Sequence, residues 1–260
     1  MQTSRITYTV FERTARITLN RPEKRNALDD VMVRELTSAF HSAAKDQSVK
    51  VVVLAANGPA FCAGADLDYL SMIVKHDMDE NRVDSGQLAS LFKVIYELRK
   101  PVIAMVNGPA LAGGCGLACV CDFIFASEEN AAFGYTEVRI GFIPAIVMVF
   151  LVKRIGEGRA REMILRGNIM SAEEALLLGL VSKVVPENQL EQTVQDLINE
   201  LLEKNSQTAM GLSKEMLVRL HGMNLPDSLE FAVNMNAAAR MTADCKQGIQ
   251  RFLNKEKLQW

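Results

Sequence analysis

Two loops rich in glycine and alanine could hold an oxyanion through main-chain N–H groups. One is Leu111-Ala-Gly-Gly-Cys-Gly-Leu117, which follows the apolar segment 101–106. A strand that leads through glycines into a helix leaves N–H groups unpaired at the positive end of the helix dipole. The other is the segment 57–67, which follows the apolar segment 50–56 and runs through small residues into an acidic position that can begin a helix. Open donors of this kind suit a reaction that develops negative charge on an oxygen.

A lone carboxylate, Glu137, stands among apolar and small residues in the segment 132–144. Apolar surroundings raise the pKa of a carboxyl group, which suits a group that must both take and return a proton. We expect the residues that bury it to be Phe133, Val138, Ile140 and Phe142. The alternative is a structural glutamate that forms an ion pair with Arg139.

Composition excludes several classes of protein. The chain has 260 residues, 49% of them hydrophobic, which is enough for one large α/β domain with a helical appendage. A net charge of −2 without long charge runs provides no basic field, so we expect no nucleic-acid partner. The apolar segments are too short to span a membrane, and residues 1–8 carry no targeting pattern. We therefore expect a cytoplasmic protein with no membrane partner.

Cysteine usage agrees with a reducing compartment. The number of cysteines, 5, is odd, which argues against a secreted disulfide framework. Cys115, Cys119 and Cys121 lie close together, but the histidines are scattered along the chain and no second paired cluster exists. We expect no metal and interpret the cysteines as small buried apolar residues.

Strand and helix patterns alternate along the first two thirds of the chain, which is typical of the α/β class. Segments 6–10 and 16–19 resemble a hairpin, a short helix is expected at 66–74 and a longer one at 83–99, with a polar loop at 75–82 between them. Ser171 and Glu174 have the spacing of a capping box. From residue 158 onward the chain is mostly helical. The expected late helices are 189–204, 207–220 and 226–241.

The same motifs carry a family resemblance. Segments 61–67, 112–117 with Cys121-Asp122, and 133–144 resemble the successive signatures of the crotonase superfamily, the enoyl-CoA hydratase/isomerase group. Two further stretches resemble it as well, an early one that contains Leu19-Asn-Arg-Pro22 and Asn26-Ala-Leu28, and a late one at 179–185. Together these motifs span nearly the whole chain in family order and spacing.

The resemblance implies a fold, a substrate and an assembly. The fold would be a crotonase-like spiral of ββα units over residues 1–200, followed by a helical trimerisation region over 201–260. The substrate would be an acyl-CoA thioester, with coenzyme A as part of the substrate and no metal or redox cofactor. The assembly would be a homotrimer or a pair of trimers.

The resemblance also assigns roles to residues. The backbone amides of Ala65 and Gly113 would hold the thioester oxygen, and Glu137 would be the acid/base. Basic residues of one early loop could meet the phosphates of coenzyme A, although a solvated charged turn is equally consistent. These basic residues are Arg21, Lys24 and Arg25. The residues that would line the substrate path are Ala27, Ala63, Gly64, Asp66, Leu67, Gly114 and Gly116.

One position departs from the hydratases of this family, which are similar to one another in carrying two glutamates. The first of the two positions is Gly116 here, which we expect to leave space opposite Glu137. One carboxylate can shuttle a proton between carbons, whereas hydration usually needs a second group. Double-bond isomerisation is therefore favoured. Hydration remains open if a bound water chain, a substrate oxygen or a rim side chain replaces the missing group, and the candidate side chains are Asp68, Tyr69 and Tyr135.

Three other readings stay open at the level of sequence. The chain could be an acyl-CoA decarboxylase, or a specialised hydratase for a branched or cyclic acyl-CoA. It could also be a non-catalytic acyl-CoA-binding subunit that keeps the fold and has lost turnover.

Overall fold

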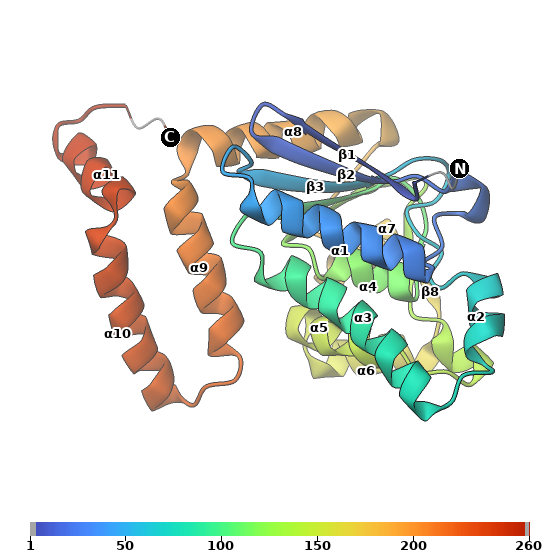
Figure 1. Cartoon of the computed structure of the whole chain (residues 1–260). Helices are drawn as coiled ribbons and strands as arrows, with labels where there is room; N and C mark the ends of the chain where they lie inside the picture. The colour runs from blue at the N-terminus through green and yellow to red at the C-terminus, as the bar shows by residue number, and fades with distance from the viewer. Residues whose placement is uncertain (1–3, 258–259) are drawn as a thin grey trace.

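A six-stranded sheet forms the centre of the body of the molecule, with helices on both of its faces, and three helices extend away from that body (Figure 1). The computed structural model describes residues 4–257 and Trp260. Residues 1–3, which belong to the segment read for a targeting pattern, and residues 258–259 of the expected helical region lie outside the described part. The expected α/β class is confirmed.

The main sheet has the order β1-β2-β3-β4-β6-β9. Its first two strands pair antiparallel, as the hairpin pattern predicted, and every later neighbour pairs parallel. Parallel strands covered on both faces are expected to be apolar throughout, and every residue of β3 is buried. The strands are β1 (Ile6–Phe11), β2 (Thr14–Leu19), β3 (Val51–Ala56), β4 (Val102–Val106), β6 (Phe123–Ser127) and β9 (Lys183–Val185).

A smaller sheet lies where the chain leaves the main one. It has the order β5-β7-β8, made of β5 (Ala110–Leu111), β7 (Ala132–Gly134) and β8 (Ile169–Ser171). Single parallel bridges join Cys62 to Ala110 and Leu28 to Ala65. These bridges tie the loop after β3 both to the small sheet and to the segment that enters α1 (Asp30–Lys45).

Each face of the main sheet has its own apolar cluster. On one face lie α1, α3 (Met78–Glu97) and α4 (Gly113–Cys119), and their buried side chains form the larger core. On the other face lies α8 (Glu187–Lys204), seen above the strands in Figure 1. Its buried residues recur at helical spacing, which gives one apolar side to set against the sheet. They are Leu190, Val194, Ile198 and Leu201.

Four shorter helices complete the body: α2 (Leu67–Ile73), α5 (Ala145–Ile155), α6 (Glu157–Arg166) and α7 (Ala172–Leu177). The capping box of Ser171 and Glu174 is confirmed at the start of α7. The polar stretch 75–82 was expected to be a loop, but most of it is helical, because α3 already begins at Met78. A second capping box, Asp77 with Glu80, satisfies the first N–H groups of that helix and starts it five residues earlier than the apolar pattern indicated.

The last three helices are α9 (Gln207–Leu220), α10 (Leu225–Met241) and α11 (Ala243–Leu253), here called the C-terminal arm. Lys214 of α9 fixes the base of the arm, since its ammonium lies 2.6 Å from the Asp122 carboxylate. Neither α10 nor α11 has a buried residue among those described. The boundary expected after residue 200 falls inside α8, which continues to Lys204.

No helix in the described part of the chain is long and apolar enough to cross a membrane.

Candidate active site

The two loops predicted to donate N–H groups lie in direct contact. Gly64 has a positive φ of 94°, and a Cβ added to it would lie 2.9 Å from the Ala112 Cβ and 3.7 Å from the Gly113 nitrogen. Such spacing leaves no room for a side chain at Gly64. The loop after β3 and the start of α4 are therefore packed backbone against backbone, which glycine permits.

Both predicted donors have free N–H groups in the described structure. Leu28 pairs with the residues on either side of Ala65, donating to the Gly64 carbonyl at 2.7 Å and accepting from the Asp66 N–H at 2.9 Å. That bridge leaves the Ala65 N–H without a partner among the described residues. Gly113 occupies the first position of α4, where no preceding turn supplies an acceptor. Two unpaired donors thus lie on touching loops.

Glu137 is connected to the second loop through the small sheet. β5 and β7 pair in parallel, and the Ala112 N–H donates to the Gly134 carbonyl at 2.7 Å. Three residues after Gly134 the chain forms the 3₁₀ helix η2 (Glu137–Ile140), with Glu137 at its start. Because one hydrogen-bonded ladder carries both segments, Glu137 is held in a set position relative to the start of α4.

The environment of Glu137 suits proton transfer. Its Oε2 is buried and has no hydrogen-bond partner in the described structure. Burial raises the pKa of this carboxyl above its ordinary value. The ion pair with Arg139 considered from sequence is not formed among the described residues. A half-buried carboxyl with an unpaired oxygen fits a group that exchanges a proton with a ligand.

Only two of the four residues expected to bury Glu137 lie in or against the core. Phe133 is fully buried, and Val138 packs against the core. Ile140 and Phe142 are instead 73% and 55% exposed, so the prediction for these two is wrong. They flank Gly141, whose left-handed φ of 75° ends η2 and leaves the chain at the surface.

Gly116 does not leave the open space expected opposite Glu137. A Cβ added there would lie 2.7 Å from the Val147 Cβ, closer still to a Val147 methyl group, and 3.5 Å from the Phe92 ring. Val147 belongs to α5 and is itself buried. In place of a second carboxylate, the first turn of α4 therefore meets an apolar wall. The sequence could not show this, since the wall comes from helices far away along the chain.

Arg21 does not have the role expected of it. The sequence placed Arg21 among the residues that could meet phosphates, but it is only 9% exposed. Its guanidinium lies 2.6 Å from the Asp66 carboxylate and 3.1 Å from that of Asp29. Lys24 is at the surface and pairs with Asp68 at 2.7 Å, and Arg25 is also exposed. Of the three basic residues, the latter two remain near the surface of the loop.

The predicted substrate-lining residues divide into two groups. Ala27 is buried, Leu67 is 79% exposed, and Ala63 hydrogen-bonds through its N–H to the Arg25 carbonyl, so all three lie around the bridge at Ala65. Gly114 faces protein, because a Cβ added to it would lie 2.7 Å from the Cys62 Cβ.

The Asp66 side chain is also committed to the protein. Its Oδ1 accepts from the N–H groups of Asp68 and Tyr69 and so caps α2.

The three side chains considered as substitutes for a second acid/base have other partners. Asp68 pairs with Lys24, and the Tyr69 hydroxyl donates to the Asp84 carboxylate. Tyr135 is fully buried beside the thiols of Cys115 and Cys119, and its burial raises its pKa well above the ordinary value. None of these three side chains is therefore free to act as a second acid/base in the described structure.

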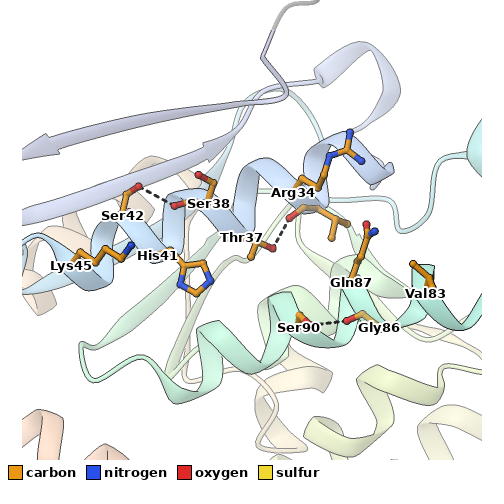
Figure 2. Close-up of a pocket in the computed structure, with 11 residues that line it drawn as sticks. Arg34, Thr37, Ser38, His41, Ser42, Lys45, Val83, Gly86, Gln87 and Ser90 are labelled. Carbon is orange, nitrogen blue, oxygen red and sulfur yellow. Dashed lines mark hydrogen bonds between the residues drawn. The ribbon is translucent and has the colours of Figure 1, made fainter.

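A separate groove of about 910 Å³ lies between α1 and α3. Figure 2 shows His41 and Lys45 on α1 and Val83, Gly86, Gln87 and Ser90 on α3. Three hydroxyl groups of the groove, on Thr37, Ser42 and Ser90, donate to carbonyls of their own helices. None of the predicted site residues lines it.

Comparison with known proteins decides the family. Residues 11–260 match the family described as "Enoyl-CoA hydratase/isomerase". The chain belongs to this family, within the crotonase superfamily. The resemblance noted from the motifs is confirmed.

Individual relatives agree over nearly the full length. A Thermus thermophilus protein named "Putative enoyl-CoA hydratase" is 43% identical, over 91% of this chain and 93% of its own. The Pongo abelii protein named "Enoyl-CoA hydratase, mitochondrial" is 35% identical, over 93% of this chain and 81% of its own. A crystal structure of an enoyl-CoA hydratase from Shewanella pealeana superimposes with a TM-score of 0.93 at 30% identity, covering 100% of this chain and 97% of that one. The expected crotonase-like fold is confirmed.

Proposed function

We propose that this member of the enoyl-CoA hydratase/isomerase family moves a double bond of an unsaturated acyl-CoA between the β,γ and α,β positions. Two observations carry the proposal: Glu137 has a buried carboxylate oxygen without a partner among the described residues, and Val147 and Phe92 fill the space beside Gly116. One carboxylate suffices for isomerisation because the same proton leaves one carbon and returns to another.

The reaction divides into two proton transfers. In the first, the Glu137 carboxylate takes a proton from the α-carbon, and the electron pair spreads onto the thioester oxygen as a dienolate. In the second, protonated Glu137 gives the proton to the γ-carbon, the double bond settles at α,β, and the carboxylate is restored. No water or redox partner is consumed.

The N–H groups of Ala65 and Gly113 would stabilise the dienolate oxygen. Each oxyanion donor is typically worth about 3 kcal/mol in the transition state. Support for this role comes from the contact between their loops and from the absence of any other partner for either N–H in the described structure. Rigid main-chain donors need no reorganisation as charge develops, which is why small residues at both loops serve this purpose.

A second candidate is hydration of the α,β double bond. The names of the relatives favour it, since both relatives quoted above are named as enoyl-CoA hydratases. Glu137 would then have to both activate water and protonate the α-carbon, or a bound water chain or a substrate oxygen would have to supply the second function. Decarboxylation and turnover of a branched or cyclic acyl-CoA remain variants of the same enolate chemistry.

Product analysis separates these reactions. The purified protein is incubated with trans-3-enoyl-CoA and with trans-2-enoyl-CoA of equal chain length, and products are followed by mass spectrometry. We expect equal-mass conversion of the trans-3 substrate and little water adduct from the trans-2 substrate. A fast water adduct with no equal-mass product would establish hydration. No product from either ester, together with tight binding of both, would identify a non-catalytic acyl-CoA-binding subunit.

We also propose that the chain assembles as a homotrimer or as a pair of trimers in the cytoplasm. Support for assembly comes from the C-terminal arm, where apolar residues of α10 are exposed although they recur along one side of the helix. The cytoplasmic setting is supported by five cysteines that are all free thiols.

A further inference from the structure

A chain of buried charges surrounds the loop that carries Ala65. Arg21 lies between two carboxylates, 2.6 Å from Asp66 and 3.1 Å from Asp29, and the side chains of all three are about nine-tenths buried or more. Arg5 pairs with the same Asp29 carboxylate oxygen at 3.3 Å. Exposed Glu23 lies 4.0 Å from the Arg21 Nε. Because removing charges from water is costly, such a cluster persists only where the geometry is closely matched.

The two aspartates begin the two helices next to the Ala65 bridge. Asp29 caps α1 by accepting from the Met32 N–H at 2.8 Å. Asp66 caps α2 by accepting from the Asp68 N–H at 2.8 Å. A single guanidinium therefore connects the N-caps of two helices.

The backbone around Ala65 is held by the same residues. Leu28, which pairs with both neighbours of Ala65, directly precedes Asp29, and Asp66 directly follows Ala65. Moving either aspartate would therefore move one side of the bridge that aims the Ala65 N–H. The hydrogen-bond strength of a donor falls steeply as its angle to the acceptor departs from linear.

The loop of Arg21 is also attached to the loop before Ala65. The Asn26 side chain accepts from the Arg21 N–H at 2.8 Å and donates to the carbonyls of Asn57 and Ala60 at 2.9 and 2.8 Å. The main chain of Arg21 thus holds one end of the 57–67 segment through Asn26, and its guanidinium holds the other end through Asp66.

We infer that Arg21 is a positioning residue for the oxyanion hole, which sets the direction of the Ala65 N–H through Asp66 and Asp29 and does not contact coenzyme A. This inference rests on the proposed function, in which Ala65 donates to the thioester oxygen. Its consequence is that the loss of Arg21 weakens binding of the enolate more than binding of the ground-state ester.

Arg5 provides a matched control. It pairs with Asp29, as Arg21 does, but no described contact joins it to Asp66. Arg21→Met and Arg5→Met each remove one partly or fully buried guanidinium from the same cluster. A merely structural role predicts similar effects of the two substitutions on activity. Because only Arg21 reaches Asp66, a positioning role predicts that Arg21→Met impairs the chemical step more than Arg5→Met does.

The measurements are kcat and KM with an enoyl-CoA, and the near-ultraviolet absorbance of acetoacetyl-CoA, which increases when the bound ligand enolises. For Arg21→Met we expect kcat to fall about tenfold to a hundredfold, a part of the loss seen when a whole oxyanion donor is removed, with KM within about threefold and a weaker enolate band. Arg5→Met should keep kcat within about threefold. Equal kcat and equal enolate bands in the two variants would overturn the inference.

Two more variants keep the test decisive if Arg21→Met does not fold. Asp66→Asn retains a good N-cap but removes the ion pair, and it should also lower kcat with little change in KM. Arg21→Lys should recover part of the enolate band. An Asp66→Asn variant with unchanged kcat would refute the positioning role. If the wild-type protein binds acetoacetyl-CoA with no enolate band at all, the proposed function itself fails, which is a different outcome from a band that Arg21→Met leaves intact.

Discussion

At the scale of single residues, the Glu137 carboxylate destabilises the fold when it is ionised, but its environment suits proton transfer. Its Oε2 is buried without a partner, and burial raises its pKa. A fold selected for stability alone would pair or expose such a group, because an unpaired buried charge is costly. An unpartnered buried oxygen is consistent with a group kept ready for a substrate proton.

Glu137→Gln should abolish turnover and leave binding of the CoA ester largely intact. Glutamine has nearly the same shape but cannot take a proton, and general acid–base groups contribute about 10²- to 10⁴-fold to rate. Steady-state kinetics together with calorimetric titration of a saturated acyl-CoA would measure both effects. Turnover within about twofold of wild type would rule out the acid/base role.

The same substitution should raise thermal stability at neutral pH. A raised pKa in the folded state means that the ionised carboxylate destabilises the fold above that pKa. The cost disappears as pH falls through the folded pKa towards the ordinary carboxyl value, because the unpaired charge is then lost. Melting curves from pH 4 to pH 8 should therefore give Glu137→Gln a higher melting temperature than wild type only towards pH 8. A constant difference across this range would contradict the assignment.

The raised pKa of Glu137 also predicts the pH dependence of activity. Ionisation of Glu137 lowers stability, but it is required for the reaction. The reaction starts from ionised Glu137, so kcat/KM should fall as pH decreases through its raised pKa. The acid limb of the profile should thus lie above the ordinary range of a glutamate. An acid limb at the ordinary value would indicate that another group titrates.

At the scale of elements, the contact between α4 and α5 fills the space beside Gly116. Gly116 lets Val147 approach the first turn of α4, and Phe92 of α3 closes the same wall. The rings of Phe92 and Phe150 pack edge to face with centroids 5.9 Å apart, which fixes α3 against α5. Three helices therefore meet at Gly116.

Substitutions at this contact should be coupled. Gly116→Ala is expected to destabilise the protein by about 1–3 kcal/mol through overpacking. Val147→Ala should also cost stability, since it leaves a cavity. In the double variant the new methyl group enters that cavity, so its free energy of unfolding, measured in urea, should exceed the value given by adding the two single effects. Strict additivity would show that the two residues do not meet.

At the scale of the whole molecule, the C-terminal arm leaves apolar side chains of α10 exposed to solvent. Its helix α10 exposes Leu225, Leu229 and Val233, which recur every four residues along one side. Large exposed apolar patches usually mark protein contacts. A second copy of the chain is the proposed partner, with the body of each protomer stabilised by its own two cores.

Charge placed on this side should weaken assembly without unfolding the body. Leu229→Lys is expected to lower the sedimentation coefficient at micromolar concentration while the far-ultraviolet dichroism of the core persists. Glu230→Lys changes charge at the next position, which lies on another side of α10, and serves as the control. A wild-type protein that sediments as a monomer would refute the proposed assembly.

The sequence alone determined the local framework of this protein. Apolar segments flanked by glycines located β3, β4 and the two loops, and helical spacing located α9 to within a residue. These features depend on neighbours along the chain. For the same reason the motifs identified the family and singled out Glu137 before any coordinate was known.

Only the tertiary structure decided what fills the space around those motifs. Arg21 looks like a free cation in sequence, yet the fold brings to it Asp29 and Asp66, the N-caps of two different helices. Gly116 looks like an open position, yet α5 sets Val147 against it. Burial and contact depend on which distant segments meet, and that information becomes visible when the sheet, the loops and the helices are assembled in space.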